Sequence, residues 1–259
     1  MKTLLKPFIA IATLVFMIGL FLVLRLMEGL NRLQSRIGKT AFLDKSQFTW
    51  LPPIEAQSQL IRRELMQLVD SRTPIPAIQE LMPDQKSLNN NNDWKTYMLY
   101  FCGQHIDDHC RACPETARLL ETIPGLETAF FSILSPGKQI PPHRGLYNGL
   151  VRFHLGLLVP PDKENCRIRV GNEWRHWEEG VGMIFDDTYI HEVRNDTGST
   201  RVVLFVDFVR PLRFPASLIN ATLLRIIGTS IGVRQAIERM EKWTAEPPQP
   251  AAAKTAVGA

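Results

Sequence analysis

Between residues 127 and 209, the chain alternates short hydrophobic runs with turn residues. The runs are ETAFFSIL, GLVRFHLGLLV, CRIRV, EWRHWEE, VGMIFDD and RVVLFVDFV. Turn signals such as Pro136-Gly137, Gly171-Asn172 and Asn195-Asp196-Thr197-Gly198 separate them. An earlier run, WKTYMLYF at residues 94–101, has the same character. Closely spaced strands of this kind predict a β-sandwich or barrel.

Helical spacing occurs on both sides of this β-rich region. Apolar residues in 56–69 recur every three or four positions, which predicts an amphipathic helix. Residues 114–122 favour a short helix, whereas 40–54 and 70–93 have the composition of a linker and a loop. The run SLINATLLRII at 217–227 is unusually apolar for a C-terminal helix. It either packs on the core or makes a second contact with a membrane surface.

The N-terminus contains 18 residues without a charge, from Pro7 to Leu24. This length is just sufficient for a helix to cross the hydrocarbon core of a bilayer. A cleaved signal peptide is the alternative, but no small-residue cleavage site follows the run. Four basic residues follow it and two lysines precede it, which weakly favours a cytoplasmic catalytic domain. The four are Arg25, Arg32, Arg36 and Lys39.

The formal net charge of +4 is mild and demands no nucleic-acid partner. The chain has four cysteines, of which Cys110 and Cys113 form a CxxC motif close to His105 and His109. A small zinc site is conceivable there, although reduced cysteines are the simpler interpretation. A disulfide would require an oxidising compartment, contrary to the orientation inferred above.

Two histidines lie at the borders of the predicted strands. His143 comes just before a strand and His191 at the end of another, so both imidazoles could bind one metal, or both could be ordinary surface or core residues. Strand alternation places Arg152 and His154 on one face. A guanidinium there, or that of Arg201 at the start of the last run, could bind a carboxylate or simply face solvent.

Residues 94–211 resemble the aspartyl/asparaginyl β-hydroxylase family of Fe(II)/2-oxoglutarate oxygenases. The segments that carry the resemblance are FSILSPGKQIPPHRG, NGLVRFHLGL, CRIRVGNEWRHWEEG, IFDDTYIHEV and RVVLFVDFVRP. Within that family the chain is most similar to the bacterial lipid A hydroxylase branch, which shares an N-terminal membrane segment, a WKTYMLY-like stretch and a C-P-E-T-like stretch.

The resemblance implies a mainly β fold with flanking helices, built on a double-stranded β-helix (jelly-roll or cupin-like) core and preceded by a transmembrane helix. The expected divisions are an anchor at 1–25, a juxtamembrane and helical region at 26–93, the hydroxylase domain at 94–212, a helical region at 213–244 and a disordered tail at 245–259. The expected location is the bacterial inner membrane, with a single pass and a cytoplasmic catalytic domain.

The resemblance also implies the cofactors: Fe(II) bound by His143 and His191, 2-oxoglutarate bound through Arg201, and dioxygen as co-substrate. Four further residues match positions that line the co-substrate pocket: Ser132, Arg152, His154 and Trp94. The common iron triad places a carboxylate two residues after the first histidine, but Gly145 stands there. Asp187 could instead hold a metal-bound water. Asp186 and Asp187 are disfavoured as a hydrolytic pair, because adjacent strand residues point to opposite faces.

Three functions are compatible with these residues. The first is hydroxylation of a membrane-lipid acyl chain, such as that of lipid A, by an enzyme that sits on the bilayer. The second is hydroxylation of aspartyl or asparaginyl residues in proteins by the same core. The third is a metal-binding barrel without catalysis, which the carboxylate-binding candidates Arg201, Arg152 and His154 argue against.

Overall fold

The computed structural model of the chain describes residues 18–19, 22–23, 25–71 and 73–245. Almost all of the predicted anchor, and the predicted tail from residue 246 onward, lie outside these ranges. Within them no single helix is long and apolar enough to cross a bilayer. By length and composition alone, the segments 216–228 and 231–243 reach that threshold together, as a pair bent by 54°.

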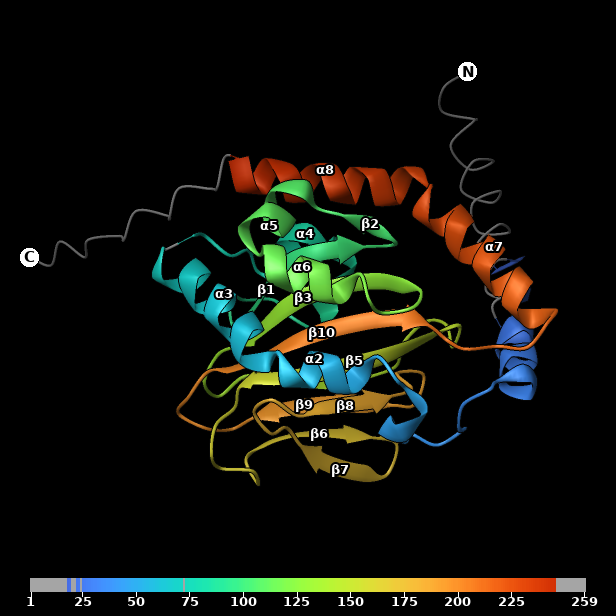
Figure 1. Cartoon of the computed structure of the whole chain (residues 1–259), viewed down its shortest axis with the longest axis horizontal. Helices are drawn as coiled ribbons and strands as arrows, with labels where there is room; N and C mark the ends of the chain where they lie inside the picture. Colours follow the sequence, from blue (N-terminus) through green and yellow to red (C-terminus); the bar gives the residue numbers. More distant parts are fainter. Residues whose placement is uncertain (1–17, 20–21, 24, 72, 246–259) are drawn as a thin grey trace, which may run out of the picture.

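The core consists of two antiparallel sheets, so the predicted mainly β architecture is confirmed (Figure 1). The larger sheet has the strand order β2-β1-β3-β10-β5-β8. Its strands are β1 (Trp94–Phe101), β2 (Gln104–His105), β3 (Leu126–Leu134), β5 (Leu150–Leu158), β8 (Gly182–Phe185) and β10 (Arg201–Val209). The smaller sheet has the order β4-β9-β6-β7. Its strands are β4 (Gln139–His143), β6 (Cys166–Val170), β7 (Glu173–His176) and β9 (His191–Asn195).

From β3 to β10 the chain passes back and forth between the two sheets, in the manner of a jelly roll. The space between the sheets is filled by side chains from both, including Phe130 and Phe205 from the larger sheet and Ile168 and Val193 from the smaller. Strand alternation turns the neighbouring residues Phe131 and Leu204 to the opposite face of the larger sheet.

Some of the flanking helices cover that opposite face. The helices before β1 are α2 (Leu51–Ala56), α3 (Ser58–Asp70) and α4 (Ile78–Leu81), with short 3-10 helices at Lys45–Gln47 and Pro83–Ser87. Two more, α5 (Asp107–Ala112) and α6 (Pro114–Leu120), lie between β2 and β3. Apolar residues of α2, α3 and α6 pack on the larger sheet. The buried carboxylate of Glu64 in α3 accepts hydrogen bonds from the backbone N–H groups of Glu115 and Thr116, which fixes the first turn of α6.

The C-terminal helices α7 (Ala216–Gly228) and α8 (Ile231–Ala245) follow β10. Figure 1 shows α8 running along one end of the molecule and α7 lying beside the N-terminal helical segment. The described part of that segment includes residues 25–34. The segment 217–227 packs on the domain through one side only: Asn220 and Leu224 are buried, whereas Leu218 and Ile226 are exposed.

Three sequence predictions were wrong in detail. Residues 51–54 of the predicted linker 40–54 belong to α2, because Pro52 and Pro53 occupy first-turn positions, where a missing N–H costs nothing. The predicted loop 70–93 contains α4 and the 3-10 helix that follows it. His143 ends strand β4 and His191 begins strand β9, two strands that the hydrophobic pattern did not predict.

The CxxC motif lies at the junction of α5 and α6, and both cysteines are free thiols. Burial raises the pKa of the Cys110 thiol to about 11 and that of Cys113 to about 12, so both are protonated at neutral pH. Nowhere in the described ranges do three or more His, Cys, Asp or Glu side chains form a group that could hold a metal ion.

Candidate active site

His143 and His191 lie next to each other on adjacent strands of the smaller sheet. His143 is the last residue of β4, His191 is the first of β9, and the two are direct partners in the antiparallel ladder. Their ring centroids are 4.1 Å apart. Strand β4 contains two consecutive prolines, which made it unrecognisable from the sequence pattern. They are tolerated because β4 is an edge strand. Two residues 48 positions apart in the chain thus lie side by side, as the sequence suggested.

Backbone carbonyls fix the proton positions of both imidazoles. The Nδ1 atom of His143 lies 2.8 Å from the carbonyl oxygen of Pro141, and that of His191 lies 3.0 Å from the carbonyl oxygen of Tyr189. A carbonyl can only accept, so each Nδ1 carries the proton and each Nε2 carries a lone pair. The buried Nε2 of His191 has no hydrogen-bond partner among the described residues.

The surroundings keep both rings neutral. Burial is the main cause that lowers the pKa of His191, to about 3, and burial also lowers the pKa of His143. A neutral imidazole with a free Nε2 is the form that ligates a metal. The pair therefore fits a metal that prefers imidazole, such as iron, and leaves the remaining coordination positions to other ligands.

The carboxylate of Asp187 lies directly against the backbone of Gly145. A Cβ atom at Gly145 would come within 2.2 Å of Asp187 Oδ2. The backbone N–H of Gly145 also donates to the carbonyl oxygen of Asp187 over 2.8 Å. Asp187 is buried, and burial raises its pKa to about 6 although Arg152 opposes the rise. A glycine at this position, where the common iron triad has a carboxylate, therefore leaves room for the side chain of Asp187.

Arg201 is a buried cation without an acidic partner within the described part of the chain. Its side chain is 1% exposed, and its Nε and Nη1 atoms have no hydrogen-bond acceptor there. Its guanidinium carbon lies 4.7 Å from the ring centroid of Trp177. Burial lowers its pKa to about 10, so it remains charged at neutral pH. An unpaired buried guanidinium is costly, which indicates that an anionic ligand completes this site.

His154 is within electrostatic reach of both Arg201 and His191. Its Nδ1 accepts a hydrogen bond from the indole N–H of Trp177 at 3.4 Å, and its buried Nε2 has no partner among the described residues. Burial, Arg201 and Arg152 all lower the pKa of His154 well below its usual value. The ring of Phe185 packs against the rings of both His154 and His191, with centroid distances of 5.0 Å and 6.0 Å.

Ser132 and Trp94 meet on the inner face of the larger sheet. The indole N–H of Trp94 donates to Ser132 Oγ over 3.0 Å, and both residues are buried. The serine hydroxyl keeps its own proton available for an acceptor in the pocket. The structure therefore brings these two predicted residues together, and their contact with a co-substrate stays a prediction.

The guanidinium of Arg152 is already held by two carboxylates. It binds Asp207 through Nε at 2.8 Å and Asp187 through Nη2 at 2.9 Å. It also lies 4.2 Å from the ring centroid of Phe205. Arg152 therefore positions Asp187 beside the histidine pair, and Arg201 is the better candidate for binding a free carboxylate.

The sequence is similar to known proteins over most of its length. The aspartyl/asparaginyl β-hydroxylase family matches residues 55–211, more than half of the chain. The chain belongs to this family. The ornithine lipid ester-linked acyl 2-hydroxylase of Rhizobium tropici is 40% identical over 216 residues, covering 83% of this chain and 77% of the relative. The resemblance inferred from the sequence and the predicted enzyme class, a hydroxylase, are both confirmed.

Two further comparisons are more limited. The human aspartyl/asparaginyl β-hydroxylase is 36% identical over 165 residues, but these are 61% of this chain and only 21% of the human protein. Among solved structures, the chain is similar to a Pseudomonas putida prolyl-4-hydroxylase over 62% of its length and 98% of that structure, at 16% identity and with a TM-score of 0.39.

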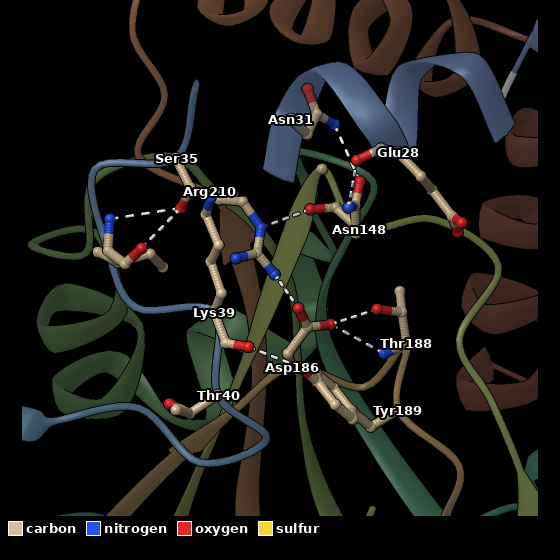
Figure 2. Close-up of polar contacts among 12 residues, drawn as sticks. Glu28, Asn31, Ser35, Lys39, Thr40, Asn148, Asp186, Thr188, Tyr189 and Arg210 are labelled. Carbon is tan, nitrogen blue, oxygen red and sulfur yellow. Dashed lines mark hydrogen bonds and ion pairs between the residues drawn. The ribbon is translucent and has the colours of Figure 1, made fainter. Parts of the chain in front are cut away.

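A buried ion pair holds the loop that leads into His191 (Figure 2). The guanidinium of Arg210 binds Asp186 at 2.5 Å, and its Nε donates to the carbonyl oxygen of Asn148 at 2.5 Å. The other oxygen of Asp186 accepts the backbone N–H and hydroxyl of Thr188. Tyr189 then donates to the carbonyl oxygen of Lys39 over 2.6 Å. Asp186 therefore has a structural role, while its neighbour Asp187 faces the site.

The sequence analysis missed two residues of the site. Asp207 pairs with Arg152 and lies on the same face of its strand as Arg201. An acidic residue within the apolar run 201–209 could have indicated a buried ion pair. Trp177, which lies under Arg201 and donates to His154, gave no signal, because it follows β7 in an irregular segment.

Replacing Gly145 with alanine is expected to disrupt the site more than the fold. The new methyl group would displace the Asp187 carboxylate, which Arg152 holds in place. Overpacking of this kind costs about 1–3 kcal/mol, and a shift of about 1 Å in a reacting group can reduce the rate by about 100-fold. Turnover of Gly145→Ala and its melting temperature would be measured beside Gly198→Ala, where a Cβ meets nothing within 4 Å. Wild-type turnover in Gly145→Ala would show that the position of Asp187 is unimportant.

Proposed function

We propose that this protein hydroxylates an acyl chain of a membrane lipid, with iron(II) held by His143 and His191 and with 2-oxoglutarate as co-substrate. The observation that carries the cofactor assignment is the buried guanidinium of Arg201, which has free donors and no acidic partner among the described residues. A planar fork of donors suits a dicarboxylate such as 2-oxoglutarate, because it can bind both oxygens of one carboxylate.

With iron(II), 2-oxoglutarate and dioxygen bound, the available chemistry is hydroxylation of an unactivated C–H bond: one oxygen atom enters the alcohol, the other enters succinate, and carbon dioxide leaves. The protein's own residues bind, orient and exclude water. His143 and His191 present their Nε2 lone pairs, because carbonyl oxygens hold the protons on Nδ1. Asp187 presents a fixed carboxylate that can hold a water at the metal.

Aromatic side chains between the sheets would keep the co-substrate site dry. Trp94, Trp177, Phe185 and Phe205 belong to the apolar cluster between the sheets. His154 and Ser132 are polar groups that are buried near these aromatic side chains. A few polar groups in a mostly apolar pocket fix the orientation of a ligand, and exclusion of water strengthens their electrostatic effect.

The choice of a lipid rests on the Rhizobium tropici relative, whose name states an acyl 2-hydroxylase of ornithine lipid. It covers most of both chains, unlike the human relative. Lipid A, suggested by the sequence, and ornithine lipid are both acylated membrane lipids, and the shared chemistry is an acyl chain next to a polar headgroup. Peptidyl aspartyl or asparaginyl hydroxylation is the alternative, supported by the 36% identity to the human enzyme.

We propose the bacterial inner membrane as the location, with the catalytic domain on the cytoplasmic side. The 18 uncharged residues 7–24 support an anchor, and the basic residues that follow support this orientation. Reduced iron and 2-oxoglutarate are both available in the cytoplasm, which is consistent with free thiols at Cys110 and Cys113.

The substrate is tested by offering the purified full-length protein lipid A, ornithine lipid or peptides containing Asp or Asn, each with iron(II), 2-oxoglutarate and air. We expect succinate release coupled to a lipid product heavier by one oxygen atom. His143→Ala provides the inactive control. Succinate release coupled to the peptides and to neither lipid would replace this proposal with the peptidyl hydroxylase.

A further inference from the structure

The outward face of α7 is apolar although it is exposed. Every fourth residue packs inward, beginning with Ala216 and Asn220. The opposite face carries Leu218, Ile219 and Ile226, and Ile227 is also exposed near the end of the helix; the exposed fractions of the four side chains lie between 37% and 63%. Single exposed apolar residues are common in soluble proteins, but four exposed aliphatic residues on one helix, three of them on one face, indicate a binding surface.

The neighbouring helix α8 shows the ordinary arrangement. It buries Val233, Ala236 and Met240 against the domain. Its exposed positions include Arg234 and Glu238, as expected for a helix that packs on one side and faces water on the other. The two consecutive helices therefore differ in character: the outward face of α7 is apolar, whereas that of α8 is mainly polar and charged.

Further exposed apolar residues lie on the segments joined to α7. Leu26 and Leu33 are 76% and 71% exposed on the helical segment 25–34. Phe214, just before α7, is 75% exposed, and Leu146, three residues after His143, is 89% exposed. We call these four residues and the outward face of α7 the apolar edge.

Hydrogen bonds join the segments of the apolar edge. The backbone N–H of Arg213 donates to the carbonyl oxygen of Gln34 over 2.9 Å. The buried amide of Asn31 donates to Tyr147 Oη over 3.0 Å, and that hydroxyl donates to Asn220 in α7 over 2.8 Å. Figure 1 shows the segment 25–34 lying next to α7. The edge is therefore a feature of the folded domain.

The charges around the apolar edge are basic. Residues 208–237 contain no Asp or Glu, and they include Arg213 and Arg225, both exposed. In residues 25–43 the one acidic residue is Glu28, which is buried and paired with Arg25 and Arg144. Arg32 and Arg36 are also exposed. Exposed aliphatic side chains flanked by arginines are typical of a helix that lies in the interface of an anionic bilayer.

We propose that the apolar edge docks the catalytic domain on an anionic lipid bilayer, independently of the N-terminal run. A bilayer is favoured over a second copy of the chain because two copies of this basic surface would repel each other. It is also favoured because the chain enters the segment 25–34 directly from the uncharged run 7–24. The inference deepens the proposed lipid hydroxylase, on which it rests for its purpose.

Docking at this edge would bring the histidine pair to the lipid surface. Arg144, next to His143, pairs with Glu28 at 3.0 Å, and Asn148 donates to the carbonyl oxygen of Glu28 over 2.9 Å. Figure 2 shows Asn31 and Glu28 above the Asn148–Arg210–Asp186 network that leads to the loop before His191. Residues on both sides of Leu146 are thus bonded to Glu28 in the helical segment 25–34.

The first test requires no turnover. The full-length protein is placed in vesicles of equimolar phosphatidylglycerol and phosphatidylethanolamine with a lipid-soluble photoactivatable carbene reagent, and labelled peptides are mapped by mass spectrometry. We expect labelling of residues 214–227 and of Leu146, with α3 and α8 unlabelled. Labelling confined to residues 1–24 would overturn the inference, whatever the substrate proves to be.

The second test compares rates on embedded and dispersed lipid. The double variant Leu218→Asp, Ile226→Asp places charges on the outward face of α7, and Val69→Asp, at a 46% exposed position of α3, is the matched control. We expect the double variant to hydroxylate vesicle-embedded lipid at least about ten-fold more slowly, a difference of about 1.4 kcal/mol. Its rate on the same lipid dispersed in detergent should stay within about two-fold of wild type, which also shows that it folds.

These outcomes separate the two proposals. An unchanged rate on vesicles would contradict docking and leave the lipid hydroxylase intact. A wild-type protein that hydroxylates no lipid in either form would remove the proposed function, and the labelling pattern would still decide whether the edge meets the bilayer.

Discussion

Replacing His143 or His191 with alanine is expected to abolish both iron binding and hydroxylation. Each imidazole contributes one Nε2 lone pair, and the described residues contain no third His, Cys, Asp or Glu suitably grouped to replace it. Loss of one ligand therefore leaves a single protein ligand. Metal sites lose about 10- to 100-fold in affinity or activity when even a supporting residue is removed, so loss of a direct ligand should exceed that range.

The measurement is a titration of each variant with iron(II), followed by turnover at saturating 2-oxoglutarate. His176→Ala is the matched control, because His176 is exposed on β7 and its near partner is Glu178 at 3.3 Å. The control should bind iron as the wild type does. Wild-type iron affinity in either His143→Ala or His191→Ala would remove that histidine from the ligand set.

The strands of the core could be predicted where strand residues alternate or form continuous apolar runs. β1, β3, β5, β6, β8 and β10 all coincide with such runs. β4 and β9 could not, because β4 contains Pro141 and Pro142 and β9 reads HEVRN, with only one large apolar residue. Both depend on pairing with each other in a small sheet, which is a tertiary effect.

The metal pair could be named from sequence only through the family resemblance. Spacing alone left His143 and His191 as possible surface histidines, and only the β4–β9 ladder makes them neighbours. The role of Arg152 was also out of reach, because a strand pattern gives the face of a side chain and not its partner. Asp207, 55 positions away in the chain, accepts a hydrogen bond from that guanidinium.

Replacing Arg201 with methionine is expected to weaken 2-oxoglutarate binding and, at the same time, to stabilise the ligand-free protein. A desolvated, charge-assisted pair contributes roughly 2–5 kcal/mol by truncation, so the KM for 2-oxoglutarate should rise by about 30-fold or more. The apparent affinity for lipid should change much less, because the guanidinium is buried beside Trp177, whereas the residues proposed to meet the bilayer, such as Leu146, are exposed.

The stability change has the opposite sign for a physical reason. Arg201 is fully buried with unpaired Nε and Nη1 atoms, and an apolar side chain of similar volume has no such desolvation cost. A gain of about 1 kcal/mol would raise the melting temperature by roughly 2–4 °C in a protein of this size. Arg118→Met, at an exposed position of α6, is the control and should change neither quantity.

The two readouts together distinguish a ligand-binding arginine from a structural one. A structural arginine would lower the melting temperature when replaced, and it would leave the response to 2-oxoglutarate intact. A ligand-binding arginine gives the wild type a melting temperature that rises with added 2-oxoglutarate, since a ligand that binds only the folded state stabilises it, and Arg201→Met should lose that rise. If Arg201→Met keeps both the wild-type KM and the wild-type thermal shift, the carboxylate is bound elsewhere, and the engaged guanidinium of Arg152 becomes the next candidate despite Asp187 and Asp207.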